Sequence, residues 1–110
     1  MEKKENPKLK ISDLIPFEYL IEASECLKCI AHPQRLRIIE ILLKGEFTVG
    51  EIAKLCDLTQ PATSDHLRLM HGKRLLTSER RNRSVYYSIA EDAPLEGILD
   101  CVKAHHLNSK

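Results

Sequence analysis

The sequence predicts a small, mainly α-helical domain that carries one β-hairpin in its C-terminal half. Apolar residues recur at helical spacing up to about residue 72. Two short runs then have strand character, and helical spacing returns near the C-terminus. At 110 residues the chain fits one domain. We expect residues 1–10, which are rich in Lys and Glu, to be a flexible tail and residues 11–110 to form that single domain.

The composition points to a soluble protein, with 43% hydrophobic and 30% charged residues. Its uncharged apolar runs are too short for a membrane-spanning helix or a signal peptide. We therefore expect a cytoplasmic protein without a membrane partner. In that compartment its four cysteines are expected to be free thiols and not a disulfide framework.

Two helices are expected before residue 46. Ser12 or Asp13 can cap the first helix, and Pro16 suits its first turn. Proline disfavours helical geometry in the preceding residue, so Pro33 separates the two helices and begins the second, which ends at Gly45. The first helix has apolar residues at helical spacing: Phe17, Leu20, Ala23, Leu27 and Ile30.

Two shorter helices follow. Thr48 and Glu51 form a capping box at the start of a third helix. A break at residues 57–58 precedes Thr59, which caps a fourth helix, and Pro61 is tolerated in its first turn. The fourth helix is expected to be anchored by Leu67 and Met70, and the inner face of the third to be Val49, Ile52, Ala53 and Leu55.

The hairpin and one more helix complete the chain. Residues 75–80 and 85–89 are the expected strands, and residues 81–84 are the turn between them. Asp92 and Pro94 are expected to start the last helix. Its apolar stripe is Leu95, Ile98, Leu99 and Val102. Such a stripe on so small a domain favours burial against a second subunit.

The third and fourth helices have helix-turn-helix spacing. In that motif the second helix lies in the major groove of DNA and presents its N-terminal residues to base edges. The polar residues expected to be exposed and to contact DNA are Gln60, Thr63, Ser64, His66 and Arg68. The alternative is that they form the solvent face of a short helix. Asp65 lies among them, and the sequence leaves its role open, because a carboxylate near phosphates is repulsive.

The basic residues are concentrated in one segment. The net charge of the whole chain is only +1. Residues 59–89 contain six Lys or Arg against two acidic residues, which gives +4 and leaves −3 for the rest. Four residues around the hairpin turn have no expected packing role: Arg80, Arg81, Asn82 and Arg83. They suit a wing that lies on phosphates or in a minor groove.

Three segments resemble one known family. The resemblance to the ArsR/SmtB family is carried by residues 31–38 (AHPQRLRI), 60–67 (QPATSDHL) and 80–87 (RRNRSVYY). It implies a winged helix-turn-helix fold of five helices and a wing, and a homodimer formed by the first and last helices. It also implies repression of transcription by binding an imperfectly palindromic double-stranded DNA operator, with release when an effector binds.

The usual sensor sites of that family do not match this sequence. Thr48 and Gly50 replace the two cysteines of the motif that the family carries at the start of the third helix. The family's zinc site on the last helix begins with an Asp-x-His motif. Here Ala93 and Pro94 follow Asp92, so only a remnant of that site matches. No cofactor is expected to be required. A thiophilic metal or metalloid ion, or a redox or sulfur species, remains a possible effector.

The remaining candidates for sensing are Cys26 and Cys29 on the first helix and Cys101 and His105 on the last. If those helices meet in a dimer, these groups can converge on a soft cation or form a reversible disulfide. The alternative is that these cysteines only pack, as Cys56 is expected to do. Three other functions stay open: a DNA-binding regulator without a small-molecule sensor, a metal-buffering protein, and an enzyme using Cys101 with His105. The last is disfavoured because the pair lacks a third orienting group. No catalytic residue is therefore assigned.

Overall fold

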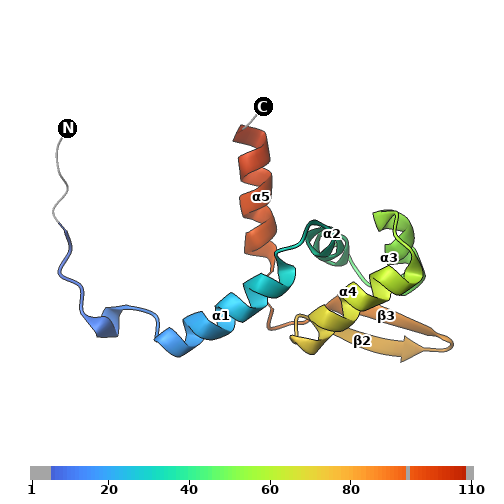
Figure 1. The fold of residues 1–110 in the computed structure, drawn as a ribbon, viewed down its shortest axis with the longest axis horizontal. Helices are drawn as coiled ribbons and strands as arrows, with labels where there is room; N and C mark the ends of the chain where they lie inside the picture. The colour runs from blue at the N-terminus through green and yellow to red at the C-terminus, as the bar shows by residue number, and fades with distance from the viewer. Residues whose placement is uncertain (1–5, 94, 109–110) are drawn as a thin grey trace.

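Five α-helices and a three-stranded antiparallel sheet make up the fold over the residues that the structure describes, 6–93 and 95–108 of a computed structural model. The elements in chain order are a 3₁₀ turn (Ile11–Asp13), α1 (Phe17–Ile30), α2 (Pro33–Leu42), β1 (Phe47–Thr48), α3 (Val49–Cys56), α4 (Gln60–Gly72), β2 (Leu76–Arg81), β3 (Ser84–Ile89) and α5 (Glu96–Asn108) (Figure 1). The expected mainly helical fold with a hairpin is confirmed. Within the described residues no helix is long and apolar enough to cross a membrane.

Two helices begin later than the sequence predicts. Ser12 and Asp13 lie in the separate 3₁₀ turn, and α1 begins only after Pro16. The prediction of one continuous helix was wrong because proline disfavours the helical conformation in the residue before it, here Ile15. At the other end Asp92 lies in a turn, and α5 begins at Glu96. The expected starting residue Pro94 lies outside the described residues.

The sheet contains one strand that the sequence did not predict. β3 is the central strand, with β2 on one side and the two-residue β1 on the other. Phe47 is paired with Tyr87, whereas β2 and β3 pair from Leu76 with Ile89 to the hairpin end. Two residues are too few to show an alternating pattern, so only their pairing with β3 reveals β1.

The core lies where α2, α3 and α4 pack against the base of the sheet. Its fully buried apolar residues are Ile38, Ile39, Ile52, Leu67 and Met70. Leu55 was expected to be part of it, but 61% of its surface is exposed. The inward positions of α3 are those of Ile52, Ala53 and the half-buried Cys56, and Leu55 lies outside this stripe.

α1 and α5 extend away from this core (Figure 1). The radius of gyration is 17.9 Å, whereas a compact chain of this length has about 13 Å. Only the first half of α5 is anchored, through the buried Leu99 and through the buried Leu95 just before the helix, while Val102 is exposed. Large apolar side chains exposed along the N-terminal segment and α1 are Leu9, Ile11, Leu14, Ile15, Phe17, Tyr19, Leu20, Ile21 and Leu27.

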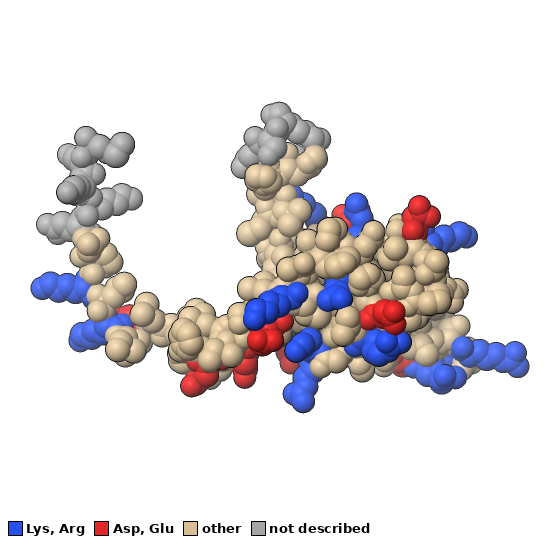
Figure 2. All heavy atoms as spheres, viewed as in Figure 1, with Lys and Arg blue, Asp and Glu red and all other residues tan. Residues whose placement is uncertain are grey.

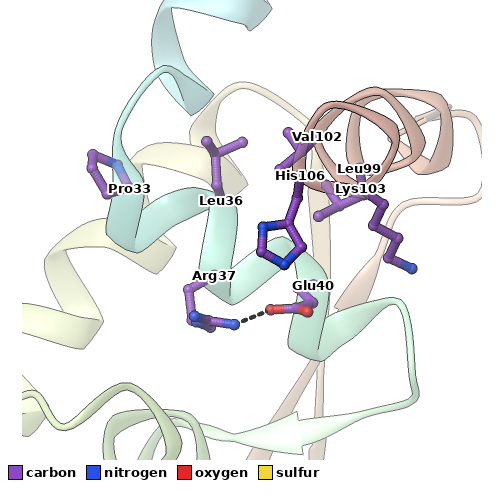
Figure 3. A pocket seen from close by; sticks show the side chains of 8 residues that line it. All are labelled: Pro33, Leu36, Arg37, Glu40, Leu99, Val102, Lys103 and His106. Carbon is purple, nitrogen blue, oxygen red and sulfur yellow. Dashed lines mark hydrogen bonds and ion pairs between the residues drawn. The ribbon is translucent and has the colours of Figure 1, made fainter. Parts of the chain in front are cut away.

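A groove of about 440 Å³ separates α2 from the projecting half of α5. Figure 3 shows His106 reaching from α5 toward the Arg37–Glu40 ion pair on α2. The residues that line the groove are Pro33, Leu36, Arg37, Glu40, Leu99, Val102, Lys103 and His106. The second half of α5 is therefore not packed closely against the body formed by α2, α3, α4 and the sheet.

Candidate nucleic-acid interface

The turn between α3 and α4 is set by local hydrogen bonds. At the start of α3, the Thr48 hydroxyl accepts from the Glu51 amide at 3.3 Å, and Glu51 accepts from the Thr48 amide at 2.9 Å, as the capping box predicted. Asp57 ends α3 with a left-handed φ of 55°, which Asp tolerates better than most residues. Thr59 then caps α4 by accepting from the Ala62 amide at 3.3 Å. Two helices joined by a three-residue turn form the expected helix-turn-helix.

Three of the predicted contact residues lie at the surface of α4. Gln60 is exposed in the first turn and Ser64 is half-buried one turn later. The Gln60 side-chain amide packs over Gly50 of α3, where a Cβ would come within 3.3 Å of Nε2. Arg68 is exposed and forms a 3.0 Å ion pair with Asp65. This pair gives Asp65 a role: its carboxylate neutralises part of the charge of Arg68.

Thr63 and His66 are less exposed than the sequence predicts, since Thr63 is buried and His66 is half-buried. Thr63 is fully buried, and its hydroxyl donates to the Thr59 carbonyl at 2.8 Å. It lies four residues before the buried Leu67, so helical periodicity carried a signal that its polarity concealed. His66 is half-buried, and its Nδ1 accepts a hydrogen bond of 3.1 Å from Arg35 Nε on α2.

The surroundings of His66 lower its pKa below the ordinary value. Burial is the main cause, followed by the positive charge of Arg35 and by His32, whose ring centroid lies 4.8 Å away, while Asp65 opposes them. Neither Arg35 nor His32 was singled out as a site residue from the sequence, although both belong to the segment 31–38 that carried the family resemblance. They are 31 and 34 residues from His66, so no local pattern indicates the contact.

The hairpin end consists of a two-residue turn, Asn82–Arg83, between the paired residues Arg81 and Ser84. Asn82 has a left-handed φ of 58°, a conformation that Asn adopts more readily than most residues. Arg80 and Arg83 are exposed and form no ion pair with any described residue.

Arg81 has a packing role that the sequence analysis had excluded. Its guanidinium forms a 2.8 Å ion pair with Glu46 and lies 4.0 Å from the centroid of the Tyr86 ring. Glu79, at 3.9 Å, adds a second carboxylate. Arg81 therefore ties the hairpin to the body, and only its neighbours present free positive charge.

The basic side chains gather on the part of the molecule that carries α4 and the hairpin. Figure 2 shows Lys and Arg around α4 and at the free end of the hairpin, and acidic groups along α1. The exposed basic residues of this region are Arg68, Lys73, Arg74, Arg80, Arg81 and Arg83. A polyanion is therefore attracted to this side of the molecule.

The four candidate sensing residues lie on the two projecting helices. Cys26 is half-buried and Cys29 is buried near the end of α1, whereas Cys101 and His105 are exposed on α5. In the described part of the chain, no three His, Cys, Asp or Glu side chains are placed to share a metal ion. Within one chain these residues do not form a metal site. Cys56 is half-buried against the core, and burial raises the pKa of its thiol despite the opposing charge of Arg37.

A helix-turn-helix followed by a hairpin with exposed arginines defines the winged helix-turn-helix class. Residues 32–78 match the family model "Bacterial regulatory protein, arsR family". The transcriptional repressor PagR of Bacillus anthracis has a similar structure, with a TM-score of 0.68 and 34% identity over 79% of this chain and 99% of that one. The chain therefore belongs to the ArsR family.

Two further relatives agree with this assignment. A homodimeric winged helix-turn-helix DNA-binding domain of Mycobacterium bovis, a possible ArsR-family regulator, has a TM-score of 0.73 and 26% identity over 86% of this chain and 89% of that one. The biofilm growth-associated repressor of Agrobacterium fabrum is 35% identical over 64% of this chain and 61% of its own length. The chain spans about three-fifths of the length of the first curated relatives it matches.

Proposed function

We propose that this chain is a transcriptional repressor that binds specific double-stranded DNA with α4 in the major groove and the hairpin on the flanking backbone. One observation carries the proposal: α4 carries the exposed Gln60 in its first turn and Ser64 one turn later, and exposed Lys and Arg side chains lie around this helix and at the end of the hairpin (Figure 2). Gln reads adenine through two hydrogen bonds, whereas arginines attract phosphates without regard to sequence. The relatives named as repressors support the same function.

The proposal includes a homodimer formed by α1 and α5. A single chain leaves Phe17 73% and Ile11 91% exposed, and an exposed apolar surface of this size favours association. A twofold dimer presents two copies of α4, which match two half-sites one helical turn, about 34–36 Å, apart. The operator is accordingly expected to be an imperfect palindrome.

The test is selection of bound duplexes from a pool of random DNA. We expect the wild type to enrich an inverted repeat. Gln60→Ala and Ser64→Ala should each weaken binding to that sequence by about 1–3 kcal/mol and change random-sequence binding little. Glu91→Ala, at an exposed turn outside α4 and the hairpin, is the matched control. If the wild type enriches no sequence, the proposed function is wrong.

We further propose that a thiol-directed effector, a soft metal or metalloid ion or a redox or sulfur species, releases the DNA. The position of the cysteines supports this: Cys26 and Cys29 lie on α1 and Cys101 on α5, the helices that project from the body. His105 is also on α5. Because one chain holds no complete site among its described residues, the site would be completed by the second subunit. An effector that links these helices changes the separation of the two α4 helices.

This second proposal is tested by measuring DNA affinity of the reduced and oxidised protein, and with zinc, cadmium or arsenite added. A roughly 5- to 150-fold change in the wild type corresponds to a coupling of about 1–3 kcal/mol. The variant Cys26→Ser/Cys29→Ser/Cys101→Ser should not respond, and Cys56→Ser should respond as the wild type does. If no treatment changes the wild type, the chain is a regulator without such a sensor.

A further inference from the structure

A guanidinium connects the end of α1 with the DNA-recognition helix. Arg35 of α2 is half-buried, and its Nη1 donates to the Cys29 carbonyl at 2.7 Å, near the end of α1. Its Nε donates to His66 Nδ1 of α4 at 3.1 Å. The rigid planar fork of arginine makes both bonds at once, so the position of His66 is fixed relative to α1.

The direction of the second bond determines where the proton of His66 lies. An arginine only donates hydrogen bonds, so Nδ1 of His66 must offer its lone pair. The neutral ring then carries its proton on Nε2. Protonation of Nδ1 would place two donors and two positive charges against each other.

The remaining nitrogen of His66 lies at the molecular surface. Nε2 has no hydrogen-bond partner in the described structure. Among the described residues that are not exposed, every fully buried side-chain nitrogen or oxygen has a hydrogen-bond partner. Nε2 is therefore accessible to solvent, on the helix that the proposed function places in the major groove.

We propose that Arg35 is a positioning residue for DNA recognition, which holds His66 so that its Nε2–H is a hydrogen-bond donor toward DNA. This inference rests on the proposed function. A ring held in this way donates to a phosphate oxygen or to an acceptor such as guanine O6 or N7 or thymine O4, and it cannot accept from the amino groups of adenine or cytosine. Arg35 itself does not touch the DNA.

The groups around His66 agree with this assignment. The charged or titratable groups that act on it are Arg35 of α2, His32 at the junction of α1 and α2, and Asp65 of α4. Burial and the two groups outside α4 lower the pKa of His66, so the neutral ring is the form present at neutral pH. His32 is itself held in place, because its Nδ1 accepts from the Gln34 amide at 3.1 Å.

The first measurement is the tautomer of His66, read from the ring ¹⁵N chemical shifts of the free protein at about pH 7.5, above the ordinary histidine pKa. We expect the wild type to show one tautomer, protonated at Nε2. Arg35→Met, which keeps the side chain long but removes every donor, should give a mixture of tautomers and a higher pKa. Arg37→Met is the matched control, since Arg37 lies on the same helix and pairs with Glu40. An unchanged wild-type tautomer in Arg35→Met would overturn the proposal.

The second measurement is binding to the duplex that the wild type selects from random DNA. Arg35→Met and His66→Ala should each weaken binding by roughly 5- to 10-fold. If Nε2–H donates to a base, both variants should lose base preference at the same position of the duplex; if it donates to a phosphate, both should leave base preference unchanged. The double variant should be no weaker than His66→Ala alone. Should Arg35→Met fold poorly by circular dichroism, Arg35→Lys takes its place, because it keeps the charge and lacks the planar fork.

The outcomes distinguish a failure of the proposed function from a failure of the role of Arg35. A wild type that selects no sequence overturns the proposed function and this inference with it. A wild type that selects a sequence, while the Arg35 variants bind that sequence equally well, overturns the role of Arg35 alone. Additive effects in the double variant overturn it as well, because they would show that Arg35 does not act through His66.

Discussion

The body formed by α2, α3, α4 and the sheet differs from the two projecting helices in how each buries its apolar residues. In the body, Ile38, Ile52, Leu67 and Met70 have no more than a trace of exposed surface. On α1, by contrast, Phe17 is 73% exposed, and its neighbours are similar. The difference indicates that the body folds on its own contacts, whereas α1 and the end of α5 leave apolar side chains exposed in a single chain, which the proposed homodimer would bury.

The largest expected effect is in the body. Leu67→Ala removes a side chain with no exposed surface and should lower the free energy of unfolding by about 2–5 kcal/mol. Leu27→Ala makes the same change at an α1 position that is half exposed in a single chain, so a smaller decrease is expected. Chemical denaturation of dilute protein measures both. Equal decreases would show that α1 is as well packed within one chain as α4 is.

The next effect sharpens the contrast at α1. Phe17→Glu should convert the dimer to a monomer, because it places a charge in the proposed interface. The thermal stability of the monomeric variant should otherwise change little, since Phe17 is mostly exposed in a single chain. Sedimentation velocity measures the assembly, with Glu18→Gln as the control at a neighbouring position. A dimer of wild-type affinity in Phe17→Glu would exclude this face from the interface.

A smaller effect distinguishes the arginines of the hairpin. If Arg80 and Arg83 bind phosphates, Arg83→Ala should reduce the slope of log affinity against log salt by roughly 0.9 for each phosphate that is no longer neutralised. Arg81→Ala should instead lower affinity with less change in slope, because Arg81 is paired with Glu46. Binding titrations over a range of salt concentrations measure this, with Lys44→Ala as a control away from the hairpin. Identical slopes for Arg83→Ala and the wild type would remove the hairpin end from the interface.

The smallest expected effect is on the pH dependence of stability, and it comes from His66, which Arg35 connects to the end of α1. The pKa of His66 is lowered in the folded state, so the unfolded state binds its proton more readily, near the ordinary value of about 6.5. The contribution of His66 to stability is therefore complete above that value and is lost as the pH falls through the lower folded pKa. Thermal melting at about one pH unit above and below the ordinary pKa should show a smaller difference for His66→Gln than for the wild type. His71→Gln, exposed near the end of the same helix, should leave the difference unchanged.

The sequence by itself was sufficient for the local features. The capping box at Thr48 and Glu51, the cap at Thr59, the proline at the start of α2 and the hairpin between β2 and β3 were all predicted, because each depends on residues within a few positions of one another. The three family segments were also visible as short local patterns. These features were enough to predict the winged helix-turn-helix.

Tertiary structure decided which side chains are available for recognition. Thr63 is buried, Arg81 is tied to Glu46 and His66 is held by Arg35, although all three had been expected to face DNA freely. The contact between Arg35 and His66 spans 31 positions of the sequence, and the contact between Arg81 and Glu46 spans 35. β1 exists only through its pairing with β3. The amino-acid sequence therefore determined where most helices and turns begin and end, since those depend on backbone hydrogen bonds between near neighbours. Only packing between distant elements determined the surface, because a polar side chain is exposed or buried according to what the fold brings against it.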